Sequence, residues 1–248
     1  MKFSSHCFFG LLAASTMATG VVGQSCSATD PTCASIPYEM DFVAPKLTLH
    51  GKVIESHKDA KDEIVKGCCS SDNNASLKPE EIGKIPQMNA DLTIQVLEDA
   101  KKAWKGGSGT WPQMSLRERM TAIANLLDEL KTQRETIVRT LMWEIGKNRK
   151  DAESEFDRTL QFCNQLLDTV SKHPEYIGHW ESVGSTQAFI KRAAIGIIMC
   201  LGPMNYPLNE TYATLIPALL MGNVAIMKVP TVGGLSHLLT SKYTNQCK

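Results

Sequence analysis

The apolar positions between residues 89 and 170 repeat with the period of an α-helix. In four successive stretches they recur every three or four residues, with polar residues between them. The four helices are expected to begin after Asn89, after Ser115, after Thr132 and near Arg149. Ser115 and Thr132 each stand three residues before a Glu, the spacing of a capping box. This pattern predicts a series of amphipathic helices.

After His173-Pro174 the period changes from that of helices toward that of strands. The run Ile195–Cys200 is continuously apolar and rich in β-branched residues, which predicts a strand buried on both faces of a parallel sheet. Pro207–Leu220 is expected to form a helix, and Val224–Met227 a second buried strand that ends in Lys228. Strand, helix and strand in this order predict a βαβ unit with a right-handed crossover. The predicted fold class is therefore α/β.

The N-terminal part has a different pattern. Residues 1–23 combine Lys2, a short apolar run and small residues, which is typical of a cleaved secretory signal and too short for a membrane span. The first half of a two-part organelle signal and a mispredicted start are alternatives. Residues 24–47 are polar and contain three prolines, as in a linker. An early strand is expected within Leu47–Val53, and residues 67–79 are expected to form a loop.

Composition adds limits to this picture. Lys plus Arg equals Asp plus Glu at 26 each, so no net charge favours nucleic acid or an anionic membrane. The chain has eight cysteines, of which Cys163 and Cys200 lie in apolar patterns and are expected to be buried thiols. Cys26 and Cys33 could pair with each other. No spacing of Cys and His predicts a metal site.

The candidate functional residues lie at the carboxyl ends of the two expected strands. Asn205 follows the first strand and could donate an N–H to a developing oxyanion, or merely stabilise a turn. Lys228 at the end of the second strand could hold a ribose or a phosphate with Thr231, or be an ordinary strand-end cation. Ligands of such sheets bind beyond the carboxyl ends of the strands. The βαβ unit lacks the GxGxxG pattern, so the residues alone leave both interpretations open.

The segment from residue 195 to residue 230 resembles the aldehyde dehydrogenase superfamily. Its motifs occur here in the order Pro203-Met204-Asn205-Tyr206-Pro207, Pro217-Ala218-Leu219, Gly222-Asn223 and Lys228-Val229-Pro230. Upstream, Trp143–Lys147 and the amphipathic helices are also similar to this family. The resemblance implies N-terminal helices followed by the first βαβ unit of an incomplete Rossmann-like parallel sheet. Tyr206, Arg158 and Thr231 look most like the NADP-dependent, non-phosphorylating glyceraldehyde-3-phosphate dehydrogenases.

The resemblance assigns roles to individual positions. Asn205 would be the oxyanion donor in catalysis. The cofactor would be held by Lys228, Thr231, Pro203 and Met204. A neutral Thr at position 231 would favour NADP over NAD, because a Glu there would repel the 2′-phosphate. Arg158 and Tyr206 would bind the substrate phosphate. Arg158 could instead form an ion pair with Glu155 or Glu153.

The same resemblance requires parts that this sequence does not supply. A nucleophilic Cys, a general-base Glu and a second glycine-bearing segment should follow residue 240, but none is present, and Cys247 has no family-like context. We therefore expect residues 48–240 to be an incomplete cofactor domain and 241–248 a tail outside the family pattern. The chain is expected to be a truncated product of an aldehyde-oxidising enzyme, or a non-catalytic short form that binds nucleotide or a full-length partner.

Remaining expectations concern partners and compartment. A small aldehyde is the expected substrate, and full-length relatives are expected to be homo-oligomers. The expected location is the secretory pathway or an organelle reached through it, or the cytoplasm if the N-terminus is mispredicted. The missing strands should leave apolar sheet surface uncovered, so the isolated chain is expected to be marginally stable or to aggregate.

Overall fold

A parallel sheet carries the predicted βαβ unit. The computed structural model describes residues 9–13, 47–49, 52–54, 62–66, 81–86 and 88–244. Strand β8 (Ile197–Leu201) lies beside β9 (Val224–Val229), and β9 lies beside β1 (Phe9–Ala13), all in parallel. Helix α7 (Pro207–Leu220) connects β8 to β9. The strand–helix–strand prediction and the α/β class are therefore confirmed.

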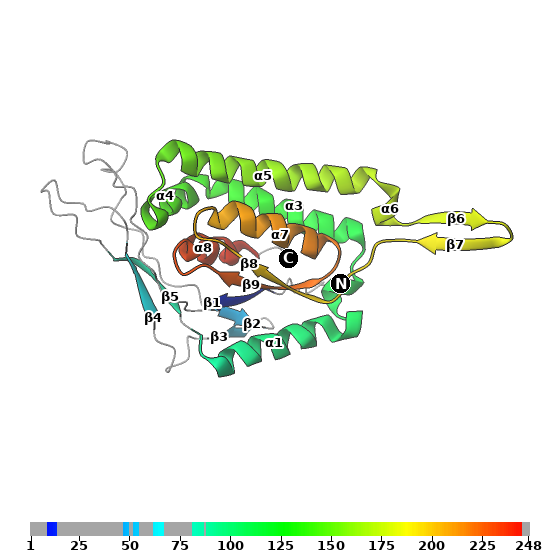
Figure 1. Cartoon of the computed structure of the whole chain (residues 1–248), viewed down its shortest axis with the longest axis horizontal. Coiled ribbons are helices and arrows are strands. Elements are labelled where there is room, and N and C mark those ends of the chain that lie inside the picture. Colours follow the sequence, from blue (N-terminus) through cyan, green and yellow to red (C-terminus); the bar gives the residue numbers. More distant parts are fainter. Residues whose placement is uncertain are drawn as a thin grey trace, which may run out of the picture.

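Helices cover both faces of this sheet (Figure 1). Helix α1 (Ala90–Trp104) packs on one face, against β9 and β8. Helix α7 packs on the other, and α3 (Leu116–Thr132) and α5 (Arg149–Lys172) lie against α7 as an outer layer. Helix α4 (Arg134–Ile145) packs between α5 and the last helix, α8 (Gly234–Thr244). The main hydrophobic core lies between the sheet and this outer layer.

Local signals explain most of the helix ends. The Asn89 side chain accepts a hydrogen bond from the Leu92 N–H at 2.9 Å and so caps α1. Ser115 and Glu118 form the predicted capping box of α3. The box predicted at Thr132 is wrong, since α3 continues through Thr132, whose hydroxyl donates to its own helix at Glu129. Helix α4 instead follows Gln133, which makes no side-chain cap.

The two strands of the unit differ in burial. All of β9 except the half-buried Lys228 is buried, as predicted. The prediction that the first strand is buried on both faces is wrong: in β8 only Cys200 is buried, and Met199 and Leu201 are 54% and 59% exposed. Among the described strands β8 stands at the edge of the sheet, which leaves these side chains uncovered.

Several short elements complete the described chain. The early strand expected within Leu47–Val53 is instead an antiparallel pair, β2 (Leu47–Leu49) and β3 (Lys52–Ile54). The remaining elements are β4 (Asp62–Lys66) paired with β5 (Glu81–Pro86), η1 (Lys105–Gly107), α2 (Thr110–Gln113), α6 (Pro174–Ile177), and β6 (His179–Val183) paired with β7 (Thr186–Ile190). The β6–β7 hairpin extends away from the rest of the molecule (Figure 1).

Strand β1 lies inside residues 1–23, where the sequence predicts a cleaved signal, and that signal stays a prediction. The expected pair Cys26–Cys33 and the whole of the loop expected at 67–79 lie outside the described residues, as does Cys247. No described helix is both long and apolar enough to cross a membrane.

Candidate functional site

The candidate site begins at the carboxyl end of β8. The Gly202 N–H donates to the Lys228 carbonyl at 3.2 Å, so the turn after β8 stays attached to the end of β9. Only glycine fits at this point, because a Cβ on Gly202 would lie 2.3 Å from Thr211 Oγ1. The two predicted groups of site residues, one after β8 and one at the end of β9, are thereby brought together.

The Asn205 side chain is available in this turn. It is exposed and makes no hydrogen bond with any described residue. A carboxamide that merely stabilised the turn would bond to nearby backbone, so the turn-stabilising alternative finds no support among the described residues. Pro203 and Met204 precede it, and Met204 is 43% exposed.

At the end of β9, Lys228 and Thr231 are both half-buried. Within the described part of the chain, Lys228 forms no ion pair. An ammonium group held beside a strand end without a carboxylate can bind an anion or a ribose hydroxyl.

A buried carboxylate fixes the start of α7. Glu155 on α5 accepts hydrogen bonds from the Leu208 N–H at 3.0 Å and the Asn209 N–H at 3.2 Å, at the start of α7. It also pairs with the ammonium of Lys147, which lies in the connection between α4 and α5. The hydrogen bonds of Glu155 therefore tie α5 to the helix that follows the Asn205 turn.

The same lysine reaches Tyr206. Lys147 Nζ lies 3.8 Å from the centroid of the Tyr206 ring, which is a cation–π contact. Arg158 is exposed on α5, beside the Glu155 face that meets α7. Its alternative role, an ion pair with Glu155 or Glu153, is not observed. Glu153 binds arginines 134 and 149 instead. Arg158 thus keeps an unpaired guanidinium within the described structure.

A second buried carboxylate fixes the start of α8. Both oxygens of Glu144, on α4, lie 3.1 Å from the Leu235 N–H. Burial raises the pKa of Glu144 to about 7, although the N–H groups of residues 233–236 act in the opposite direction. In the first turn of α8, burial lowers the pKa of His237 to about 4. The His237 Nε2 lies 3.4 Å from Thr211 Oγ1.

The described cysteines are not nucleophiles. Cys163 and Cys200 are both buried, as predicted. Burial raises the pKa of Cys163 to about 12, and it also raises the pKa of Cys200, against a weaker hydrogen bond from Thr214. A thiol of raised pKa carries little thiolate at neutral pH. Groups of metal-ligating side chains are absent from the described part of the chain.

Sequence reasoning missed Lys147, Glu155, Glu144 and His237. A signal for Glu155 was present, since it stands on the otherwise apolar face of α5 formed by Ala152, Phe156 and Leu160. A carboxylate on a buried helix face needs partners, which predicts a cap or an ion pair. The sequence could not show which helix supplies the N–H groups.

Comparison with known proteins defines the class of this fold and site. The model of the aldehyde dehydrogenase family matches residues 69–248. The chain therefore belongs to the aldehyde dehydrogenase family. It is 31% identical over 167 residues to an NADP-dependent glyceraldehyde-3-phosphate dehydrogenase of Streptococcus equinus. It is 26% identical over 174 residues to a protein of the same name from Pisum sativum. These alignments cover 66% and 67% of this chain and 34% of each relative, so the chain spans about a third of their length.

Solved structures agree on the fold. An NADP-dependent glyceraldehyde-3-phosphate dehydrogenase of Bacillus halodurans, complexed with NADP, superposes with a TM-score of 0.66 at 22% identity, over 79% of this chain and 40% of that one. A betaine aldehyde dehydrogenase of Staphylococcus aureus superposes with a TM-score of 0.69 at 17% identity, over 82% of this chain and 39% of that one. The Rossmann-like fold of the family is therefore shown.

Proposed function

We propose that this chain is the N-terminal, cofactor-binding part of an NADP-dependent dehydrogenase that oxidises glyceraldehyde 3-phosphate to the acid. The observation that carries the proposal is the unpartnered carboxamide of Asn205, on the turn whose backbone is bonded to Lys228 at the end of the next strand. The relatives from Streptococcus equinus and Pisum sativum support this choice of cofactor and substrate.

In this proposal Asn205 stabilises the negative charge that forms when a thiolate adds to the aldehyde carbonyl. A neutral amide N–H can donate to the oxyanion without exchanging a proton with it. The thiolate must come from outside the described residues, because Cys163 and Cys200 are buried thiols of raised pKa. We therefore expect these two cysteines to support no aldehyde oxidation.

The residues at the end of β9 fit the adenosine side of NADP. The starts of both α7 and α8 are already occupied by glutamate carboxylates, so neither can hold a phosphate in the usual way of helix N-termini. Side chains must do so instead, and Lys228 with Thr231 would hold the ribose and its 2′-phosphate. NADP, when bound, supplies the acceptor of the hydride.

Arg158 and Tyr206 would hold the phosphate of the substrate. A guanidinium without an ion-pair partner among the described residues offers two parallel N–H donors to a phosphate. Tyr206 is 43% exposed, so its hydroxyl can reach a ligand above the turn.

Nucleotide binding to the chain tests the cofactor assignment. Thr231→Glu should weaken NADP binding about tenfold or more and leave NAD binding nearly unchanged, because the new carboxylate repels only the 2′-phosphate. Titration calorimetry with both nucleotides gives the two affinities. Thr214→Glu, the same change on the exposed side of α7, serves as the control. Equal losses for NADP and NAD, or no binding of NADP to the unchanged chain, would refute the assignment.

The catalytic assignment is tested in a polypeptide that also contains the nucleophile. There, Asn205→Ala should lower turnover roughly 10²-fold or more, measured as NADPH formation with glyceraldehyde 3-phosphate. Near-normal turnover would remove Asn205 from the oxyanion role.

A second candidate function is a non-catalytic short form that pairs with a longer family member. The exposed edge of β8, with Met199 and Leu201 uncovered, favours it. Co-expression with a tagged longer relative separates the two candidates: stable co-purification without any change in aldehyde oxidation supports the short form.

A further inference from the structure

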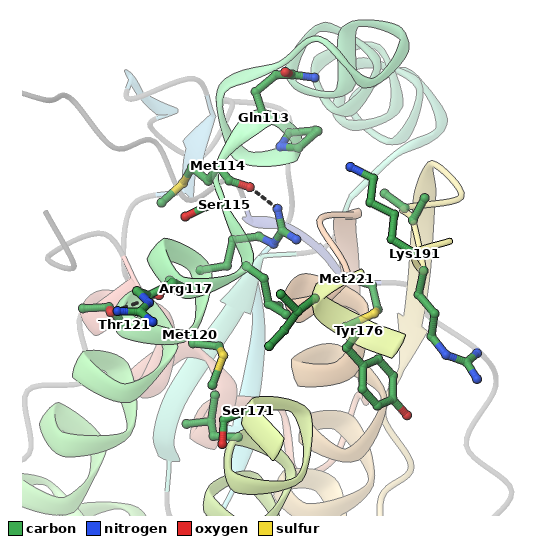
Figure 2. A pocket seen from close by; sticks show the side chains of 18 of the residues that line it. Gln113, Met114, Ser115, Arg117, Met120, Thr121, Ser171, Tyr176, Lys191 and Met221 are labelled. Carbon is green, nitrogen blue, oxygen red and sulfur yellow. Dashed lines mark hydrogen bonds between the residues drawn. The ribbon is translucent and has the colours of Figure 1, made fainter. Parts of the chain in front are cut away.

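A large cavity lies at the opposite end of the sheet from the candidate site. Its volume is about 1110 Å³, and Figure 2 shows the residues around it. It is bounded by the start of α3, by the end of α5 with α6, and by the segment between β7 and β8. Ala194 and Met221, which line it, precede β8 and β9 in the chain, so the cavity adjoins the amino ends of the strands. None of the residues assigned to NADP or aldehyde lines it.

The charges that line the cavity are mostly positive. Arg117, Arg119, Lys191 and Arg192 contribute four cations, and Asp168 is the single carboxylate. Asp168 pairs with Lys172 at 2.6 Å and so is already compensated. None of the four lining cations forms an ion pair within the described structure. An unbalanced positive lining attracts an anionic ligand.

Arg119 is the fixed member of this set. Its Nε donates to the Leu220 carbonyl at 2.8 Å and its Nη1 donates to the Met114 carbonyl (the dashed line beside Met114 in Figure 2). The guanidinium also packs on Gly222, where a Cβ would lie 3.2 Å from Cζ. The two carbonyls hold the group in place but leave its charge unneutralised. Burial lowers the pKa of Arg119, although the neighbouring Glu118 carboxylate acts in the opposite direction.

The rest of the lining is largely apolar. It includes Met120, Leu167, Phe189 and Met221. The Arg192 guanidinium lies over the ring of Tyr176, 5.2 Å from the ring centroid. In Figure 2, Tyr176 and Lys191 lie across the cavity from Met114 and Ser115. A ligand that fills this space must combine an anionic group with an apolar or aromatic body.

We propose that this cavity binds a small organic phosphate, with its phosphate held between Arg119 and the Lys191–Arg192 side and its apolar body against Met120, Tyr176 and Met221. The planar guanidinium of Arg119 keeps N–H donors that its two carbonyl partners do not use, and such donors match phosphate oxygens. Walls on three sides and a volume just above the usual range of small-molecule pockets favour a small ligand over a macromolecule. The site is independent of the proposed dehydrogenase function.

Direct binding of 1-naphthyl phosphate to the 248-residue chain tests the proposal. Titration calorimetry should show binding that weakens as salt is raised, and 1-naphthol and inorganic phosphate alone should each bind about tenfold or more weakly. The double variant Lys191→Glu/Arg192→Glu should lower the affinity at least about tenfold. Both side chains are exposed, so this variant should fold. Arg119→Met should lower the affinity further, but it also removes the hydrogen bonds to the Leu220 and Met114 carbonyls.

Lys150→Glu is the matched control, since Lys150 is exposed on α5 away from the cavity. Its affinity should equal that of the unchanged chain. The proposal is overturned by unchanged affinity in the Lys191→Glu/Arg192→Glu variant, or by no detectable binding of 1-naphthyl phosphate. It is also overturned if Arg158→Glu causes the same loss, because the probe would then occupy the proposed substrate site. Tight binding of nucleic acid or anionic vesicles without binding of the probe would overturn it as well.

Discussion

The starts of α7 and α8 are both capped by a buried glutamate, but the two glutamates have different charged surroundings. Each helix follows a strand of the sheet. Each begins with N–H groups that have no partner within the helix, and a buried glutamate accepts hydrogen bonds from them. At α7 the glutamate, Glu155, is compensated by Lys147. At α8 the glutamate, Glu144, accepts from the Leu235 N–H, and burial raises its pKa to about 7. The first carboxylate is paired with a cation, whereas the second has a pKa near neutral pH.

This difference separates the two halves of the candidate site. The α7 start follows Asn205 and Tyr206, and the Lys147–Glu155 ion pair lies beside it. The α8 start follows Lys228 and Thr231, and its cap depends on pH. The nucleotide side should therefore respond to pH near neutrality.

The largest expected effect comes from removing the cation of the α7 cap. Lys147→Met should destabilise the chain by about 3 kcal/mol or more, because the Glu155 carboxylate would remain buried without a cation. Lys147 is 14% exposed and Glu155 fully buried, so solvent offers little compensation. Urea unfolding followed by circular dichroism measures the change. Lys150→Met, an exposed neighbour, should lie within about 0.5 kcal/mol of the unchanged chain. An equally small effect of Lys147→Met would show that the ion pair does not hold α7.

The next effect concerns the pH dependence of the α8 cap. The pKa of Glu144 is raised from 4.5 to about 7 on folding, so between these values the folded chain binds a proton that the unfolded chain does not. Its contribution to stability therefore increases as pH falls from 7 toward 5, by about 2 kcal/mol. Glu144→Gln should remove this increase. The urea midpoints of the two chains are measured at pH 7 and pH 5, and their difference at each pH isolates the contribution of Glu144. A difference that did not change with pH would contradict this prediction.

His237 should oppose Glu144 over much of the same range. Its pKa is lowered from 6.5 to about 4 on folding, so the unfolded chain binds the proton first and stability falls with pH below 6.5. Between pH 6.5 and 5 this amounts to about 2 kcal/mol. The change in unfolding free energy from pH 7 to pH 5 should therefore be more favourable in His237→Leu than in the unchanged chain. In Glu144→Gln the same change should be less favourable than in the unchanged chain. Shifts of the same sign in both variants would refute the opposing pair.

The sequence predicted the βαβ unit because its signals are local. Apolar runs, the Pro207 helix start and the capping residues Asn89 and Ser115 each act within a few residues. The exposure of β8 was missed, since the burial of a strand depends on neighbours that its own residues do not reveal. The two glutamate caps were missed for a related reason. Each joins residues more than fifty positions apart in the chain, so no short pattern links donor to acceptor.

The smallest expected effect tests whether the α7 start depends on side-chain contacts beyond its ion pair. The Asn209 Nδ2 donates to Thr159 Oγ1 at 3.3 Å, a second link between α7 and α5. Asn209→Ala should cost only about 0.5 kcal/mol, because the bond is long and the partly exposed amide can bond to water instead. The Asn209 N–H to Glu155 is retained in this variant, so the cap itself is unchanged. If Asn209→Ala destabilised the chain as much as Lys147→Met, the Lys147–Glu155 pair would not be the dominant support of α7, and the contrast with α8 would fail.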